Sequence, residues 1–256
     1  MKKTIIALLA LCGCASAATE LVAEWDNFSS LTNNGYTLTI TGTATKVEDG
    51  ILKVTGSNPA SATIDVSDAG LTFGNGFTLN MTLSNVNPLS GDAPYGFVGL
   101  KSGDYVNFAL AGVNSSSYDA KFCYRSKSSN ITTSYPEETS GDLSILKSTT
   151  TVSTLTITFS NSAFNMYLNG GLVATGTPNS GMMDDNTSSA IIDTISFGAW
   201  AGGSDNGLLE EYVHSFAIYE GAMTAAEVRA LMVPEPTTAT LSLLALAGLA
   251  ARRRRR

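Results

Sequence analysis

The chain has 256 residues, of which 43% are hydrophobic and 14% charged, and its formal net charge at pH 7 is −7. Seven of the 15 basic residues are Lys2, Lys3 and Arg252 to Arg256, so residues 18–235 carry 8 basic against 22 acidic residues, a charge of −14. Such an acidic surface repels phosphate backbones, which excludes nucleic acid as a partner.

The first residues have the order of a secretory signal peptide. Lys2 and Lys3 are followed by an apolar run over 4–13 and by the small residues Ala15-Ser16-Ala17. We predict that residues 1–17 form a signal peptide cleaved after Ala17 and that the remainder is exported. The apolar run is too short to cross a hydrocarbon core of about 30 Å, which disfavours a retained membrane helix. A lipoprotein signal at Cys12-Gly13-Cys14 is the other alternative.

Cleavage at this point would remove Cys12 and Cys14 and leave Cys123 as the only thiol. No internal disulfide could then form, so apolar burial has to hold a body of about 215 residues, which is long enough for one β domain. Cys123 lies between Phe122 and Tyr124, where a small buried side chain is a better interpretation than a nucleophile.

Short runs of alternating apolar and polar residues, separated by Gly, Ser, Asn and Thr, fill this body. They lie at 36–43, 51–55, 77–83, 95–100, 118–124, 155–159 and 191–197. The alternation is strict over 155–159, which predicts a strand with one buried and one wet face. Many such strands without a long helix predict a single antiparallel β-sandwich of about a dozen strands.

Two local signals place a hairpin and a helix. Asn169-Gly170-Gly171 separates the predicted strands 164–168 and 172–175, and Asn-Gly supplies the positive φ angles that a tight turn needs. Thr224 precedes a predicted helix over 225–232, and Glu227 completes a capping box with it.

Both segments resemble one family. Residues 154–175 are similar to the central hairpin of concanavalin A-like, laminin-G-like (LamG) domains, and Phe216-Ala217-Ile218-Tyr219 with the segment 222–231 resembles the last strand and closing helix of that family. The resemblance implies an all-β jelly-roll β-sandwich over residues 18–232 with one short C-terminal helix. Where the family often has an acidic residue before the last strand, this chain has His214, which we expect to be a partly buried strand residue.

Some members of this superfamily are glycoside hydrolases. Their retaining chemistry needs two carboxylates about 5 Å apart, and the resemblance implies a Glu-x-Asp-x-x-Glu strand to supply them. The sequence has no such segment. Glu210 and Glu211 are adjacent, so in a strand they would point to opposite faces and could not cooperate. A glycoside hydrolase is therefore the less favoured alternative, and we expect no enzyme activity.

Lectin-like members bind sugars through an aromatic platform flanked by polar groups. Alternation over 191–200 places Trp200 on the face opposite Phe197, at the start of a Gly-rich loop that carries Asp205 and Asn206. Trp200, Asp205 and Asn206 are thus the candidate contacts for an extracellular polysaccharide or surface glycan. The alternative is that Trp200 packs under an edge loop. We expect ordinary strand packing for Tyr95, Tyr118 and Tyr124.

No cofactor is predicted. Asp184-Asp185-Asn186 with Asp193 or Asp205 offers oxygen ligands suited to calcium, but the spacing fits no named calcium loop, and solvated turns explain the same acids. A structural extracellular-matrix protein without a small ligand is the main alternative to a lectin, and the sequence separates these two classes poorly.

Residues 233–256 have three parts in order. Pro234-Glu235-Pro236 is followed by an apolar stretch over 237–251 and by Arg252, Arg253, Arg254, Arg255 and Arg256. As a helix the apolar stretch would span about 22 Å, and snorkelling arginines with local thinning of the bilayer can cover the rest. The arginines favour the cytoplasmic side, which places the body outside.

The order of these parts resembles the PEP-CTERM sorting tail of bacteria that make extracellular polysaccharide. The resemblance implies an exosortase-type sorting protease that acts near Pro234-Glu235-Pro236. It also implies an inner-membrane intermediate and a final location at the cell surface or outside the cell. A plain C-terminal membrane anchor is the alternative.

Overall fold

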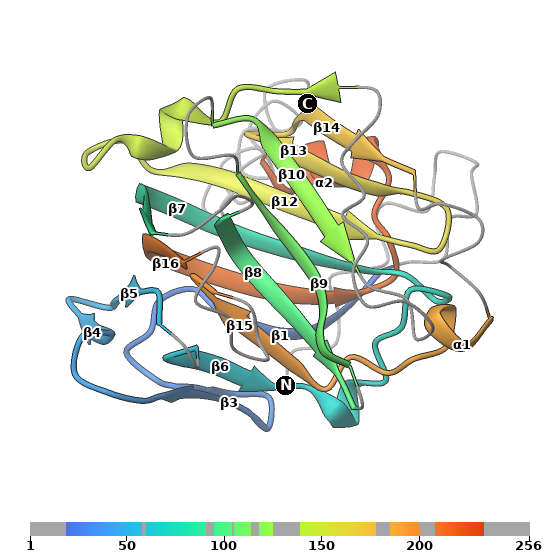
Figure 1. Cartoon of the computed structure of the whole chain (residues 1–256), viewed down its shortest axis with the longest axis horizontal. Helices are drawn as coiled ribbons and strands as arrows, with labels where there is room; N and C mark the ends of the chain where they lie inside the picture. Colours follow the sequence, from blue (N-terminus) through green and yellow to red (C-terminus); the bar gives the residue numbers. More distant parts are fainter. Residues whose placement is uncertain are drawn as a thin grey trace, which may run out of the picture.

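The fold is seen in a computed structural model, which describes residues 19–57, 60–90, 95–103, 105–113, 118–124, 139–177, 185–199 and 208–232. Two antiparallel sheets lie face to face (Figure 1), so the predicted β-sandwich is confirmed. The predicted signal peptide and sorting tail lie outside the described residues. Within the described part of the chain, no helix combines the length and the apolar character needed to cross a bilayer.

The larger sheet has nine strands, with β16 near its middle. Across the sheet they are β11 (Thr139–Ser140), β14 (Gly171–Gly176), β13 (Phe164–Leu168), β12 (Ser153–Phe159), β7 (Phe77–Ser90), β16 (Leu208–Glu220), β5 (Ile51–Thr55) and β4 (Lys46–Glu48). The ninth strand, β1 (Glu20–Trp25), pairs with β16 beyond the end of β5. The strand β16 therefore pairs with three others and organises this layer.

The second sheet has seven strands and covers the inner face of the first. In order they are β10 (Ala120–Tyr124), β9 (Tyr105–Val113), β8 (Tyr95–Ser102), β15 (Thr194–Phe197), β6 (Ala62–Asp65), β3 (Tyr36–Ile40) and β2 (Thr32–Asn33). The described helices are short: α1 (Asp185–Ser188), α2 (Ala225–Leu231), and the 3₁₀ turns Ser67–Ala69 and Ser144–Lys147.

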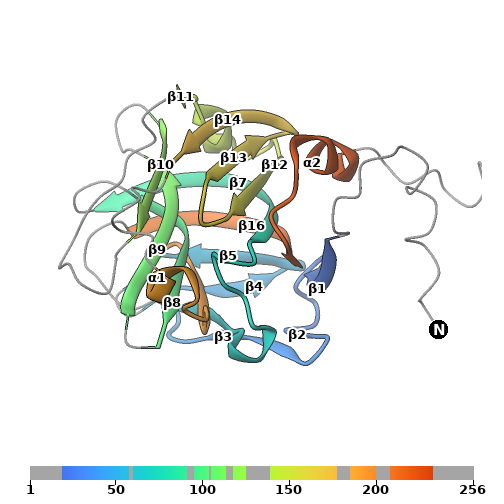
Figure 2. The same ribbon diagram turned by 90° about the vertical axis from the view of Figure 1, so that its right-hand side faces the viewer.

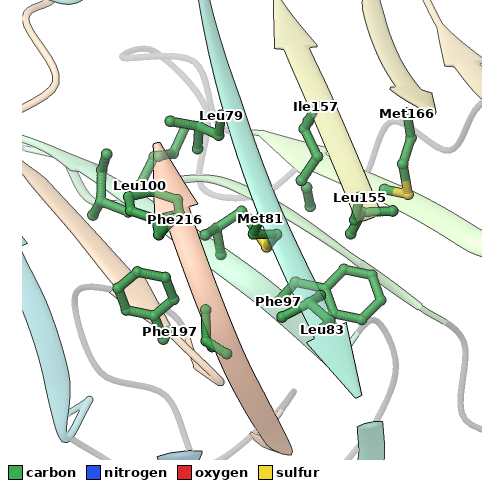
Figure 3. Close-up of a cluster of buried hydrophobic side chains, with 14 of the residues drawn as sticks. Leu79, Met81, Leu83, Phe97, Leu100, Leu155, Ile157, Met166, Phe197 and Phe216 are labelled. Atoms are coloured by element: carbon green, nitrogen blue, oxygen red, sulfur yellow. The ribbon is translucent and has the colours of Figure 1, made fainter. Parts of the chain in front are cut away.

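Apolar side chains from both sheets fill the space between the layers. Leu79, Met81 and Leu83 alternate along β7 toward the interior, and Phe97 and Leu100 of β8 and Phe197 of β15 meet them from the other sheet (Figure 3). Burying each such side chain stabilises the fold by about 1.5–3 kcal/mol. This burial is what holds the two layers together.

The predicted turn and cap are confirmed. Asn169 (φ 49°) and Gly170 (φ 78°) both adopt positive φ between β13 and β14, as a type I′ turn requires. Thr224 caps α2 by accepting a hydrogen bond from the Glu227 backbone N–H, while the Glu227 carboxylate accepts one from the Thr224 backbone N–H, at 2.7 Å.

The prediction of one wet face for 155–159 is wrong. Thr156 and Thr158 lie on the outer face of β12, yet they are 0% and 1% exposed. Their register partners explain why: Thr78, opposite Thr158, bonds the Gly221 carbonyl and the Met223 N–H, and Tyr167, opposite Thr156, packs with Met223 and Val228 of the α2 region. The segment that leads into α2, and α2 itself, thus cover this part of the sheet.

The two ends of β16 have different neighbours. At its start, Leu208 pairs with Ser90 of β7 and follows the segment 200–207. At its end, Glu220 pairs with Glu20, the first residue of β1, and the chain continues into α2. Figure 2 shows β1 and α2 on the same side of the molecule, where β16 ends.

Candidate functional site

The predicted sugar contacts Trp200, Asp205 and Asn206 lie outside the described residues, but the residues on either side of them are described. Ile195 and Phe197 are buried on the core face of β15, as the alternation predicted. Ala199 is buried too, but it lies beyond the end of β15 and after Gly198 (φ 67°), where the alternation no longer holds. Ser196, on the opposite face, is buried as well, and its hydroxyl donates to the carbonyls of Gly99 (3.3 Å) and Ala199 (2.8 Å). The chain thus enters the segment 200–207 from a fixed position.

Backbone hydrogen bonds hold the residues on either side of this segment, and one of them, from Leu209 to Gly198, joins the two sheets. The Gly198 N–H donates to the Phe97 carbonyl (3.2 Å), the Leu209 N–H donates to the Gly198 carbonyl (2.8 Å), and the Gly56 N–H donates to the Leu209 carbonyl (2.9 Å). We call Gly56, Phe97, Gly198 and Leu209 the junction.

The junction requires glycine. At Gly198 (φ 67°), an added Cβ would lie 2.7 Å from the Leu209 carbonyl oxygen, and at Gly56 it would lie 2.4 Å from the Gly198 oxygen. Only residues without a Cβ allow the backbones to approach this closely. The segment that carries the predicted sugar contacts is therefore anchored on a rigid base.

Glu211 is a carboxyl group enclosed in the core beside the junction. Its side chain is 0% exposed, and neither carboxyl oxygen has a hydrogen-bond partner. Burial raises the pKa of this carboxyl well above its ordinary value. The Gly198 N–H lowers that pKa by a smaller amount, but it already donates to Phe97. A neutral Glu211 is therefore the form that this environment favours.

The sequence contained a signal for this buried acid. Leu209, Glu211 and Val213 alternate along β16 and all point inward, whereas the half-buried Glu210 points outward and accepts a hydrogen bond from Asn85 Nδ2 at 3.3 Å. The prediction that Glu210 and Glu211 point to opposite faces is confirmed. The two carboxylates thus cannot act together on one glycosidic bond.

The strand opposite these acids is irregular. Between Ser84, which pairs with Tyr212, and Asn87, which pairs with Glu210, β7 carries an extra residue, and Asn85 there has φ 53°. Its backbone N–H donates to the Ser148 carbonyl at 2.8 Å. No sequence pattern predicted this bulge in the larger sheet.

His214 forms a further polar contact between β16 and β7. Its Nε2 lies 2.8 Å from Ser84 Oγ, and burial lowers the pKa of the imidazole, so the ring is neutral at pH 7. The expectation of a partly buried strand residue is confirmed. Ser84 is 1% exposed, and a hydroxyl so enclosed cannot reach a substrate as a nucleophile must. We interpret the Ser84–His214 pair as a structural contact.

A polar hollow of about 240 Å³ lies beside β1 and β2. The segment 24–33 lines it, with Phe28 and Leu31 excepted. Glu24 and Asp26, two of the lining residues, lie near Tyr219 of β16. Burial, together with these carboxylates, raises the pKa of Tyr219 to about 12. Trp25 stacks on Phe216 in the core, with ring centroids 6.1 Å apart, and offers no platform to a ligand. The hollow can hydrogen-bond hydroxyl groups but cannot stack a sugar ring.

The acids considered for calcium are only partly described. Asp193 is committed to local structure, since its carboxylate accepts hydrogen bonds from the Gly103 N–H and from the Thr194 hydroxyl. Asp185 and Asn186 begin α1, while Asp184 and Asp205 lie outside the described residues. Among the residues that the structure describes, no three His, Cys, Asp or Glu side chains gather where they could hold a metal ion.

Of the three tyrosines considered as platforms, Tyr95 packs within β8 as expected, whereas Tyr118 precedes β10 and has φ 56°. Tyr95 and Tyr118 are buried, and the Tyr118 hydroxyl donates to the Val86 carbonyl at 3.1 Å. The side chains of Tyr124 and Cys123, at the end of β10, lie outside the description.

No family model and no curated protein matches this sequence. Solved structures do match its fold. The binding domain of Paraclostridial Mosquitocidal Protein 1 gives a TM-score of 0.57 at 16% identity, over 83% of this chain and 52% of that chain. The receptor-binding domain of botulinum neurotoxin mosaic serotype C/D gives 0.56 at 12% identity, over 83% and 50%.

A third similar structure is the Trypanosoma rangeli sialidase in complex with 2,3-difluorosialic acid. Its TM-score is 0.58 at 15% identity, over 85% of this chain and 33% of the sialidase. The present chain thus spans about half the length of the two toxin structures and a third of the sialidase. The similarity is one of fold. The sandwich thus occurs in binding domains and also in an enzyme.

Proposed function

We propose that residues 18–232 form a non-catalytic, lectin-like module that binds an extracellular polysaccharide or surface glycan and takes part in adhesion. The observation that carries the proposal is the junction, which fixes both ends of the segment containing Trp200, Asp205 and Asn206. Rigid scaffolds that carry a binding loop are a common way to build recognition sites. The fold shared with toxin binding domains is consistent with this role.

The chemistry of these three residues suits a neutral or cationic sugar. An indole face can stack on the apolar side of a pyranose ring, while a carboxylate and an amide can bond its hydroxyl groups. An excess of 14 negative charges over residues 18–235, from 8 basic and 22 acidic residues, disfavours strongly anionic glycans. We place the domain in the concanavalin A-like, LamG-like group as part of the same proposal.

The export route is a separate part of the proposal. Residues 1–17 direct secretion, residues 237–251 hold the chain in the inner membrane, and Arg252 to Arg256 stay on the cytoplasmic side. An exosortase-type protease then acts at Pro234-Glu235-Pro236, so that the mature protein reaches the surface or the medium. Its C-terminus would lie near residue 235.

Binding measurements on Trp200→Ala test the glycan site. If the indole is a platform, the variant should bind the same glycan about 1–3 kcal/mol more weakly in titration calorimetry while its circular dichroism spectrum stays unchanged. Unaltered affinity in a folded variant would remove Trp200 from the site. Loss of folding would assign the indole to the core, as the alternative in which it packs under a loop requires.

A matrix protein that uses the sandwich as a surface spacer is the second candidate. The extensive hydrogen bonding and burial along β7, β12 and β16 would serve a rigid spacer equally well. The two candidates differ in one measurable property, because only the lectin retains a defined glycan.

A further inference from the structure

The core encloses the carboxyl group of Glu211 without giving it a partner. The side chain is 0% exposed, and neither of its oxygens takes part in a hydrogen bond. Buried polar groups in folded proteins nearly always have a hydrogen-bond partner, because an unpaired one gives up its bonds to water without replacement. Packing alone therefore does not account for a glutamate at this position.

Glu211 lies beside the contact between the two sheets. On β16 it follows two residues after Leu209, whose N–H donates to the Gly198 carbonyl and so joins the sheets. Directly opposite Glu211 on β5 is Val54, and a Cβ added at Gly198 would lie 2.7 Å from Val54 Cγ1. The Gly198 N–H also acts on the Glu211 carboxyl, since it lowers the pKa of that group. Glu211 and Gly198 are therefore neighbours at the junction.

The Gly198 N–H is a donor that an ionised Glu211 could take. It now donates to the Phe97 carbonyl at 3.2 Å, the longest of the three junction bonds, since the other two measure 2.8 and 2.9 Å. An N–H group binds a carboxylate about twice as strongly as a neutral carbonyl. Because residue 198 is glycine (φ 67°), its N–H can turn toward a new acceptor without moving a side chain.

No cation among the described residues faces the Glu211 carboxyl. The ionisable side chains that share the core with it are Tyr95 and Tyr118, which are phenols and can carry no positive charge. The other ionisable side chains on the strands around it point to the outer face or lie at a strand end: Glu210, Tyr212, His214, Lys53 and Lys101. Within this part of the chain, an ionised Glu211 therefore depends on a hydrogen bond and not on an ion pair.

We propose that Glu211 makes the junction a pH-sensitive latch between the two sheets. Protonated Glu211 leaves the Gly198 N–H on Phe97 and the sheets joined. When Glu211 releases its proton to solvent, the carboxylate draws the Gly198 N–H away from Phe97, which detaches Gly198 from β8 and loosens its bond with Leu209. The latch is closed in acid and loosens as pH rises, because burial raises the pKa of Glu211. It would act whether or not the domain binds a glycan.

The amide signal of Gly198 in nuclear magnetic resonance tests the latch. The full chain is labelled with nitrogen-15, kept in detergent micelles and titrated from pH 5 to pH 9. We expect the Gly198 amide proton to move downfield in one step, as the Glu211 carboxylate replaces the Phe97 carbonyl as its acceptor. At pH 8 the Leu209 N–H should also exchange with deuterium several-fold faster than the Ile157 N–H of β12, after correction for their intrinsic rates, because only the junction has loosened.

Two variants identify the cause. Glu211→Gln cannot ionise, so its Gly198 signal should stay in place and its Leu209 N–H should exchange no faster than that of Ile157. Glu210→Gln, on the outer face, should titrate like wild type. Both variants keep His214, so the titration of the imidazole does not distinguish them.

Three results would overturn the latch. The first is a Gly198 signal that does not move by pH 9 while the chain stays folded. The second is an equal movement of this signal in Glu211→Gln, which would assign it to another group. The third is unfolding of the wild type before any movement of Gly198, because ionisation would then break the whole domain instead of the junction.

Discussion

Replacing Glu211 with Gln should make the domain more stable at neutral pH and nearly unchanged in acid. Glutamine keeps the shape of the side chain but cannot ionise. In wild type, the pKa of Glu211 is raised in the folded state from its ordinary value of 4.5, because burial disfavours the charged form. The folded protein therefore holds a proton that the unfolded chain has already released.

The sign and size follow from proton linkage. Below pH 4.5 the carboxyl is neutral in both states, and its full contribution to stability is present. As pH rises above 4.5 the unfolded state loses the proton first, so the free energy of unfolding falls by about 1.4 kcal/mol per pH unit until the folded pKa is reached.

Urea unfolding from pH 4 to pH 8, followed by circular dichroism, measures this effect as the difference between wild type and Glu211→Gln. Taking the difference cancels the other titrating groups, including His214. The control is Glu210→Gln, because that carboxylate lies on the outer face and bonds Asn85. It should leave the wild-type slope in place. A pH-independent difference for Glu211→Gln, or a less stable variant at pH 7.5, would show that ionisation of Glu211 does not destabilise the folded domain.

Three further variants test the other parts of the account. Gly198→Ala should lower the free energy of unfolding by about 3 kcal/mol or more in urea titration, because backbone strain and a clash with the Leu209 carbonyl add. The control Gly70→Ala has a similar φ of 64° but open space around it, so it should lose only about 1 kcal/mol. Similar losses in the two variants would mean that close packing at the junction does not require glycine. Thr224→Ala removes the α2 cap and should cost about 1 kcal/mol by the same assay, while no change would show that the cap is dispensable. Replacing Pro234-Glu235-Pro236 with three alanines should leave export intact and trap the full-length chain in the inner membrane; secreted wild-type peptides ending in Arg256 in mass spectrometry would contradict sorting by cleavage.

Local rules predicted the local elements well. The Asn169-Gly170 turn, the Thr224 capping box and the strand Ile51–Thr55 depend on residues close in sequence, and each forms as expected. Alternation also predicted that Glu210 and Glu211 point to opposite faces of the sheet. Because Leu209 and Val213 lie two residues to either side of Glu211, the same alternation could have placed Glu211 on the apolar face.

Features that depend on distant residues could not be predicted. Thr156 and Thr158 read as solvent-facing, but α2 and the segment before it, more than 60 residues later in the chain, cover them. Likewise, the bulge at Asn85 lies where β7 pairs with β16, and its partner Glu210 is 125 positions later in the chain. The pairing partners of a strand set such features, and periodicity along one strand carries no information about them.

A glycan array probed with residues 18–232 measures whether this domain binds a defined class of glycan. We expect repeatable binding to one class of neutral or cationic sugar, with loss of that signal in a folded Trp200→Ala variant. Uniform silence across the array, from a domain whose β-rich circular dichroism spectrum shows that it is folded, would contradict the lectin assignment and favour the matrix role.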